Sequence, residues 1–186
     1  MDCCGLVTLY YTGKGDKGDT GVLANCRVTK DNELVEAIGA VDELNSHVGT
    51  AILYIHDENV RMNLKLIQND LFIIGAGLAS AEGAKIKKAE LGREHLERLE
   101  REINAMGREL PELRKFVLPG GGEGAVHLHM ARAVARRAER RIVSASKRYK
   151  IEENVLAYAN RLSSFFFVAA LYLNYKEGVE EAHPTY

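Results

Sequence analysis

The stretch EAIGAVDELNSHVGTAILYI, residues 36–55, decides the fold class of this chain of 186 residues. Its apolar side chains recur at every third or fourth position, at Ile38, Val41, Leu44, Val48, Ile52 and Ile55. This is the period of an α-helix that buries one face. The same period predicts four further helices over residues 59–80, 94–106, 125–147 and 151–176. The sequence therefore predicts an all-α fold, a bundle of four or five helices.

The remaining segments complete a single domain, residues 1–186, in which the bundle spans residues 36–177. Residues 1–35 form an irregular, glycine-rich arm, and residues 178–186 form a short tail. A stretch rich in Lys, Glu and Gly, residues 81–92, reads as a connection between two helices.

Composition narrows the class of function. Apolar residues make up 46% of the chain and charged residues 27%, as in ordinary globular proteins. A net charge of −1 argues against nucleic acid or an anionic membrane as the partner. No apolar run reaches the roughly 18 residues that span a bilayer, and Asp2 does not fit a signal peptide. The odd number of cysteines, Cys3, Cys4 and Cys26, indicates a reducing cytoplasm.

The arm contains the sequence YTGKGDKGDT, residues 11–20, which is the strongest local signal for function. Its three glycines allow backbone N–H groups to turn inward and bind an anion. Lys14 and Lys17 could neutralise phosphate oxygens, and Asp16 or Asp19 could contact Mg²⁺. The stretch lacks the P-loop pattern. A nucleotide triphosphate is one interpretation, and a solvated turn is the other.

The helix predicted over residues 125–147 carries most of the positive charge. Its cations, continuing to residue 148, are Arg132, Arg136, Arg137, Arg140, Arg141, Lys147 and Arg148, opposed only by Glu139. At 100° per residue, Arg132, Arg136 and Glu139 share one face beside the apolar stripe. This face suits bidentate contact with phosphate or carboxylate, or an ion pair with another helix or subunit. Arg137, Arg141 and Arg148 are interpreted as a solvated face.

Two other helices place polar side chains on apolar faces. Asn160 could contact adenine or ribose, or it could join two helices. Asp42 in the first helix should seek an arginine, with Arg132 or Arg136 as the candidates. His127 and His129 diverge by about 200° on a helix, so they are not expected to share a metal ion.

These motifs together resemble the ATP:corrinoid adenosyltransferases of the propanediol-utilisation (PduO) type. The resemblance rests on YTGKGDKGDT (11–20), VDELNS (41–46), IQNDLFIIGAGLA (67–79), KFVLPGG (115–121), RAVARRAERRIV (132–143) and NRLSSFFF (160–167). The blocks span roughly residues 7–177. The resemblance implies a ferritin-like five-helix bundle of the cobalamin adenosyltransferase type, assembled as a homotrimer with ATP at the subunit interface.

The implied reaction moves the 5′-deoxyadenosyl group of ATP to the cobalt(I) of a reduced corrinoid such as cobalamin, and it releases triphosphate. ATP enters with Mg²⁺, and no resident metal is expected. The resemblance implies two further partners, a corrinoid reductase and an enzyme that uses adenosylcobalamin.

The resemblance also implies the roles of individual residues. The phosphates would contact Thr12, Gly13, Lys14, Gly15, Thr20, Gly21 and Lys30. The rest of the nucleotide site would comprise Arg136, Arg137, Ala138, Glu139, Arg140 and Asn160. Asp42 would pair with Arg132 across the interface, and these two residues with Arg136 would be the catalytic set. Phe116 would pack against the corrinoid and displace its lower axial base.

Three features depart from the family pattern. Ser164 stands where many members have Asp, and Gly13 replaces a basic residue common in the loop. The tail after Lys176 is short, so a C-terminal cap over the corrinoid is expected to be missing.

Two other classes of function fit part of the sequence. A helical scaffold would use the arginines for salt bridges between subunits, and a bundle that binds RNA or DNA would use them on phosphates. A di-iron bundle is excluded because no Glu-x-x-His motif occurs on two helices.

Overall fold

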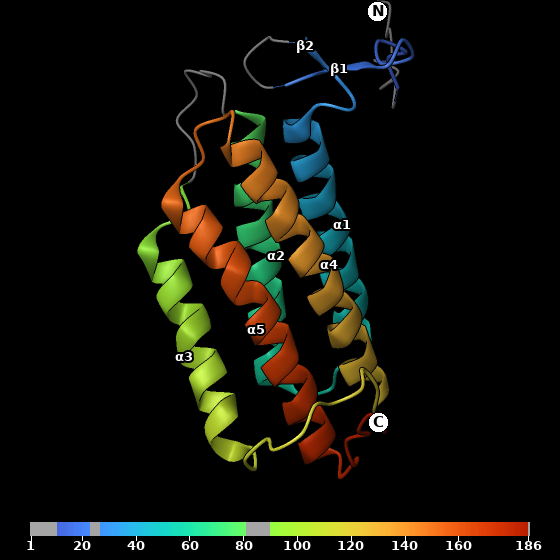
Figure 1. Ribbon diagram of the computed structural model, residues 1–186, viewed down its shortest axis with the longest axis vertical. Coiled ribbons are helices and arrows are strands. Elements are labelled where there is room, and N and C mark those ends of the chain that lie inside the picture. Colours follow the sequence, from blue (N-terminus) through green and yellow to red (C-terminus); the bar gives the residue numbers. More distant parts are fainter. Residues whose placement is uncertain (1–10, 23–26, 81–89, 186) are drawn as a thin grey trace, which may run out of the picture.

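A computed structural model describes residues 11–22, 27–80 and 90–185 (Figure 1). It contains five helices, α1 (Glu33–Leu53), α2 (Glu58–Ala79), α3 (Arg93–Glu109), α4 (Glu123–Ser146) and α5 (Glu153–Lys176). All five predicted helices are confirmed, with ends within about three residues of those expected from the apolar period. The three cysteines and residues 81–89 of the predicted connection lie outside the described residues.

Side-chain caps explain where the first two helices begin. The Asn32 side chain accepts a hydrogen bond from the Leu34 amide at 2.8 Å, so α1 starts ahead of its first apolar repeat. The Asp57 side chain likewise accepts from the Val60 amide at 2.9 Å and caps α2. Asn32 also donates to the Tyr149 hydroxyl at 2.9 Å, which joins the start of α1 to the segment between α4 and α5.

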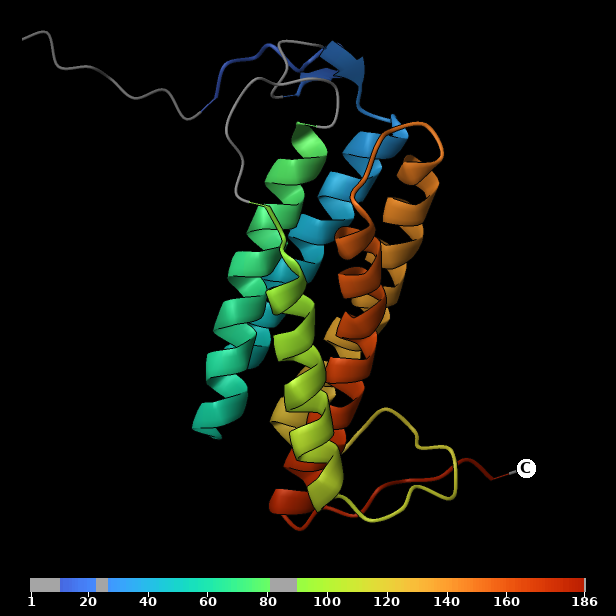
Figure 2. The ribbon, with the colours of Figure 1, turned by 90° about the vertical axis from the view of Figure 1, so that its left-hand side faces the viewer.

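The helices pack as a bundle of α1, α2, α4 and α5, with α3 against the outer side of α5 (Figures 1 and 2). One continuous apolar core fills the space between them. Its largest fully buried side chains include Leu44, Ile67, Leu128, Leu162 and Phe165. Burial of this apolar face, rather than helix propensity, supplies most of the stability of such a bundle.

Among the helices that the structure describes, α5 alone is long and apolar enough to pass a membrane-span test, with a mean hydropathy of 1.3. Half of the tested window is buried inside the protein. Helix α5 lies between α3 and α4, and Phe165 and Phe166 are completely buried there. Its position in the core accounts for its apolar composition.

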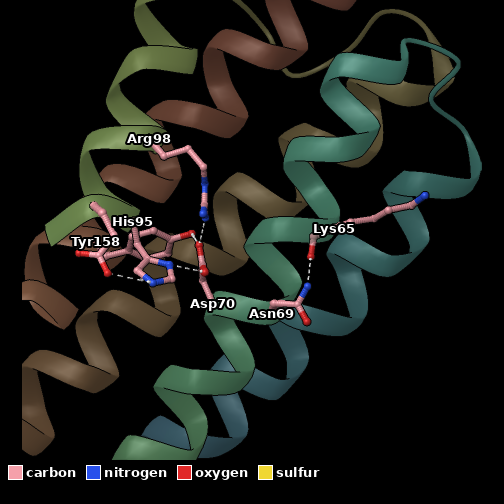
Figure 3. A network of polar contacts seen from close by, with 7 residues as sticks. Lys65, Asn69, Asp70, His95, Arg98 and Tyr158 are labelled. Atoms are coloured by element: carbon pink, nitrogen blue, oxygen red, sulfur yellow. Dashed lines mark hydrogen bonds and ion pairs between the residues drawn. The ribbon is translucent and has the colours of Figure 1, made fainter. Parts of the chain in front are cut away.

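A buried carboxylate joins three helices (Figure 3). Asp70 of α2 accepts hydrogen bonds from His95 Nδ1 of α3 at 2.7 Å and from the Tyr158 hydroxyl of α5 at 2.5 Å. Arg98 of α3 forms an ion pair with the same carboxylate. Burial, with the charge of Asp70 second, raises the pKa of Tyr158 well above its ordinary value, so the phenol remains a donor. The next residue, Asn69, is exposed, and its side chain donates to the Lys65 carbonyl at 3.0 Å.

The N-terminal arm contains a small sheet that the prediction of an irregular arm did not include. Strands β1 (Asp19–Gly21) and β2 (Arg27–Thr29) pair in antiparallel register, with Asp19 opposite Thr29. Strands of three residues are too short to show an alternating pattern in the sequence. The arm lies at the end of the bundle where α1 begins, and the chain end after α5 lies at the opposite end (Figure 1).

Candidate functional site

The glycine-rich loop of the arm is folded back on β2. Gly13 and Gly18 have φ values of +66° and +86°, which favour glycine. The Lys30 amide donates to the Gly18 carbonyl at 2.8 Å, and Arg27 Nη2 donates to the Lys14 carbonyl at 2.6 Å. A Cβ atom on Gly15 would lie 3.3 Å from Lys30 Nζ, so this ammonium group lies over the loop.

These contacts bring together part of the predicted phosphate site, namely the backbone of residues 13–18 and the side chain of Lys30. Thr20 and Gly21 lie next to the loop in β1. Thr12 accepts a hydrogen bond from the Lys14 amide at 3.4 Å. Backbone amides of a glycine-rich loop beside an ammonium group are a combination suited to an anion.

The two carboxylates of the loop are not equivalent. Arg27 Nε donates to Asp19 at 2.6 Å, and this hydrogen bond and the arginine charge lower the pKa of Asp19 despite some desolvation. Asp16 is exposed and forms no ion pair within the described part of the chain. Of the two candidates for contact with Mg²⁺, Asp16 is the one that remains free.

One edge of α4 forms ion pairs with α1. The pairs are Arg137 with Glu43 at 2.5 Å, Arg141 with Glu36 at 3.5 Å, and Arg148, just after α4, with Glu33 at 3.3 Å. The expectation of a merely solvated face is therefore incomplete, because these arginines are exposed but each meets a carboxylate. A helical wheel shows the face of α4, and it does not show which side chains of α1 lie opposite.

The other edge of α4 has no such partners. Within residues 11–22, 27–80 and 90–185, neither Arg132 nor Arg136 meets a carboxylate, and the exposed Asp42 meets no cation. Arg132 Nε is buried without a hydrogen-bond partner. The predicted pair of Asp42 with Arg132 is thus not formed inside one chain. Both groups are available to a ligand or to a second copy.

Glu139 and Asn160 meet between α4 and α5. Asn160 Nδ2 donates to Glu139 Oε1 at 2.8 Å, so the alternative in which Asn160 joins two helices describes this chain. Both residues belong to the predicted nucleotide site, and they lie on the same edge as the unpaired Arg136. Beside them Arg140 donates to the Arg136 carbonyl at 3.1 Å. A basic hollow of about 490 Å³ is lined by Arg137, Arg140, Arg141, Val143, Ser144 and Lys147.

The two histidines of α4 face different neighbours, as the helical spacing predicts. His127 stacks on Tyr54 of α1, with ring centroids 4.3 Å apart. His129 is 4% exposed and lies 6.3 Å from the Phe167 ring of α5. In the part of the chain that the structure describes, no group of three or more His, Cys, Asp or Glu side chains could hold a metal ion.

His129 is a buried imidazole without hydrogen bonds to either ring nitrogen. Burial, and then the charge of Arg132, lowers its pKa below the ordinary value of 6.5. The folded protein therefore resists protonation of this ring, whereas the unfolded chain takes up the proton near pH 6.5. Stability from neutral His129 is present at higher pH and is lost as pH falls through this range.

We expect wild type to lose stability relative to His129→Gln when pH falls from 8 to 5, by at most about 1.4 kcal/mol per pH unit. Urea unfolding at several pH values measures this difference. His56→Gln is the control, because His56 is exposed and lacks contacts among the described residues. If the free energy of unfolding depended on pH in the same way in wild type and His129→Gln, the lowered pKa of His129 would be contradicted.

An apolar cavity of about 890 Å³ lies at the end of the bundle opposite the arm. Residues 110–113 after α3 form one wall, and Phe167, Leu171 and Tyr175 of α5 form another. Residues of the C-terminal tail, including His183, form the third. The short tail thus folds back over this end of the bundle. The expectation that a cap over the corrinoid is missing stays a prediction.

The three consecutive phenylalanines of α5 divide between the core and the cavity. Phe165 and Phe166 are buried, and Phe167 lines the apolar cavity. Phe116 is 78% exposed and lines an adjoining hollow of about 630 Å³ that shares Leu113 and His183 with the cavity. Phe116 therefore lies at the mouth of the cavity and not inside it.

His129 connects α4 to the wall of the cavity. Arg132 lies close enough to His129 to lower its pKa, His129 contacts Phe167, and Phe167 lines the cavity. In contrast, no hydrogen bond or ion pair joins the described residues of the arm before Asp31 to α4. Within the described residues, His129 of α4 thus reaches the cavity wall through Phe167, whereas the glycine loop forms no such bond with α4.

Comparison with known proteins gives consistent matches. The family model described as cobalamin adenosyltransferase matches residues 10–173. A corrinoid adenosyltransferase of Bacillus subtilis is 44% identical over 91% of this chain and 88% of its own length. The corrinoid adenosyltransferase MMAB of Homo sapiens is 37% identical over 92% of this chain and 71% of its own length.

A solved structure is similar over nearly the whole fold. It is a Phe-to-His variant of a PduO-type ATP:corrinoid adenosyltransferase from Lactobacillus reuteri, complexed with cobalamin and ATP. Its TM-score is 0.90 at 36% identity, and the match covers 95% of this chain and 96% of that one.

Proposed function

Since this chain belongs to the cobalamin adenosyltransferase family, we propose that it binds ATP between two subunits of a homotrimer and a reduced corrinoid in the apolar cavity beside Phe167. The reaction is adenosyl transfer. Cobalt(I) attacks C5′ of ATP, the cobalt–carbon bond forms as the C5′–O bond breaks, and triphosphate leaves with the electron pair.

The protein supplies charge and position and does not supply a nucleophile. Cobalt(I) is itself the nucleophile, so no general base is required. The leaving triphosphate develops negative charge, which cations and amides held in place beforehand stabilise. We assign this role to the glycine loop with Lys14 and Lys30, and to Arg136 and Arg140 of α4. Mg²⁺ arrives as part of the substrate MgATP.

The proposal of an interfacial site rests on charged side chains that have no ionic partner within the described chain. Asp42 and Arg132 have no ionic partner in the described chain, although the neighbouring arginines of α4 do. Buried polar atoms such as Arg132 Nε are rarely left without partners. A second copy that brings Asp42 to Arg132 would satisfy both groups and would bring its arm toward these arginines.

Arg137 requires a change of partner in this proposal. It is paired with Glu43 at 2.5 Å, with both side chains nearly half exposed. Exposed pairs contribute only about 0–1 kcal/mol, so ATP can replace Glu43 at little cost. Ala138 and Glu139 would complete the nucleotide site, with Asn160 held by Glu139.

The corrinoid proposal rests on the size and apolar lining of the cavity. An apolar pocket that excludes water and the lower axial ligand would make cobalt(II) easier to reduce to cobalt(I). Phe116 at its mouth is the side chain placed to displace that ligand. A corrinoid reductase would supply the reduced substrate, and an enzyme dependent on adenosylcobalamin would use the product. We place this sequence of reactions in the cytoplasm.

The interfacial pair can be tested by mixing two impaired variants. Asp42→Asn and Arg132→Ala are each expected to lower kcat/KM about tenfold, through loss of a charge-assisted contact. In a ring of three subunits, every mixed trimer keeps one interface with both native residues. Mixed trimers isolated through two different affinity tags should therefore recover at least about a third of the wild-type activity.

The control is a trimer of Asp42→Asn copies that carry the same two tags, which should show no recovery. Mixed trimers with activity no higher than that of the two single variants would contradict pairing across the interface. A monomer in solution with full activity would contradict the interfacial site altogether.

A further inference from the structure

Asn174 is a fully buried polar side chain in the last turn of α5. Its Oδ1 accepts a hydrogen bond from the Gly122 amide at 3.0 Å. Its Nδ2 donates to the Gly120 carbonyl at 3.2 Å and to Glu181 Oε1 at 3.0 Å. One side-chain amide thus joins α5 to both the loop before α4 and the C-terminal tail.

The loop before α4 is shaped to fit this amide. Gly121 has a φ of +109°, which favours glycine, and a Cβ atom there would overlap the Asn174 side chain. The Asn174 carbonyl also accepts from the Val179 amide at 2.8 Å, which turns the chain at the start of the tail. The loop before α4 and the C-terminal tail are therefore both held by Asn174.

The tail then reaches the backbone of Phe116. The Leu118 amide donates to the Ala182 carbonyl at 2.8 Å. His183 Nδ1 lies 2.8 Å from the Phe116 carbonyl oxygen. Because a carbonyl oxygen only accepts, Nδ1 carries the proton and donates it. The exposed Phe116 ring is not packed in the core, and these bonds hold the backbone segment that carries it.

The tail also forms part of the cavity wall. Glu181 and His183 line it, and His183 also lines the hollow that contains Phe116. We propose that Asn174 and His183 are positioning residues, which hold the tail against the loop and thereby place Phe116 at the mouth of the cavity. This inference rests on the proposed function, because it concerns the corrinoid substrate. It predicts an effect on the corrinoid and none on ATP, whose proposed site lies on the arm and α4.

The test compares His183→Ala, His183→Gln and Asn174→Ala with wild type in an anaerobic assay with cob(I)alamin and MgATP. We expect His183→Ala to raise KM for cob(I)alamin about three- to tenfold, the effect of losing one hydrogen bond. The KM for ATP should stay within twofold. His183→Gln, whose amide can donate to the same carbonyl, should restore most of the loss.

Two further measurements report position directly. The absorbance of bound cob(II)alamin reports loss of the lower axial base, and His183→Ala should lower the fraction in this form, in the same direction as Phe116→Ala. Hydrogen exchange at the Leu118 amide should be faster in His183→Ala, because the bond to Ala182 opens. Asn174→Ala should change both the cob(II)alamin absorbance and the Leu118 exchange rate more than His183→Ala does. If Asn174→Ala does not fold, the result for His183→Ala alone tests the inference.

His56→Ala is the matched control, because it removes an exposed histidine without contacts among the described residues. An active wild type with KM, cob(II)alamin absorbance and Leu118 exchange all unchanged in His183→Ala would overturn the inference alone. Equal losses for ATP and corrinoid would also overturn it. A wild type that does not transfer the adenosyl group would overturn the proposed function itself.

Discussion

Replacing Asp70 by asparagine is expected to lower the free energy of unfolding by about 3 kcal/mol. The change removes the charge that Arg98 pairs with and leaves the hydrogen bonds of His95 and Tyr158 with a weaker acceptor. The loss should lie at the low end for broken buried pairs, because the Arg98 side chain is 24% exposed and can reach water. Urea unfolding at a fixed subunit concentration measures it.

Asp31→Asn is the matched control, because Asp31 is exposed and lacks contacts within the described residues. It should change the free energy of unfolding by less than about 0.5 kcal/mol. Tyr158→Phe combined with Asp70→Asn should cost less than the sum of the two single changes, since both act on one hydrogen bond. A loss for Asp70→Asn no larger than that of the control would contradict a stabilising role for the network.

Replacing Arg136 by alanine is expected to lower kcat/KM for ATP about 100-fold. Arg136 is exposed on the free edge of α4 without an ionic partner in the described chain, so its guanidinium is available to the triphosphate. Charge-assisted hydrogen bonds contribute about 1.5–3 kcal/mol, and a contact to the leaving group affects both binding and rate. KM for ATP should rise and kcat should fall together in steady-state assays.

Arg136→Lys should recover only part of the loss, because an ammonium group cannot form the bidentate contact of a guanidinium. Arg101→Ala is the control, since Arg101 is exposed on α3 and has no partner among the described residues. ATP kinetics of Arg136→Ala within twofold of wild type, in a protein that still assembles normally, would remove Arg136 from the site.

The helices were predictable because their apolar residues repeat with a strict period. The spacing of residues 36–55 identifies α1 to within about three residues, and only the Asn32 cap shifts its start. The two strands of the arm were missed, because three residues are too few to show a period. The folded-back tail was missed because it is held by individual hydrogen bonds, such as those of Asn174 and His183, which leave no periodic pattern in the sequence.

The Asp70 network shows what a sequence contains and what it leaves open. Asp70 lies between Ile67 and Ile74 on the buried face of α2, so its burial could have been predicted from the period. A buried carboxylate requires partners. Those partners are 25, 28 and 88 residues away, and nothing in a local pattern selects them. Such pairings become visible only when the helices are placed in space.

The candidate site was predictable in its residue types and less so in its contacts. Helical geometry separated Arg132 and Arg136 from Arg137 and Arg141, and the structure places the two groups on different edges of α4. Helical geometry alone did not reveal that glutamates of α1 lie opposite Arg137 and Arg141. The roles of individual residues toward ATP and corrinoid came from the family resemblance and remain predictions.

The most direct test of adenosyl transfer is an anaerobic assay of the purified protein with chemically reduced cob(I)alamin and MgATP. The assay follows the cob(I)alamin absorbance and then tests the product for sensitivity to light. We expect protein-dependent formation of a photolabile adenosylated corrinoid, with one triphosphate released for each product molecule. Absence of that product while the protein still binds ATP would contradict adenosyl transfer as the function of this chain.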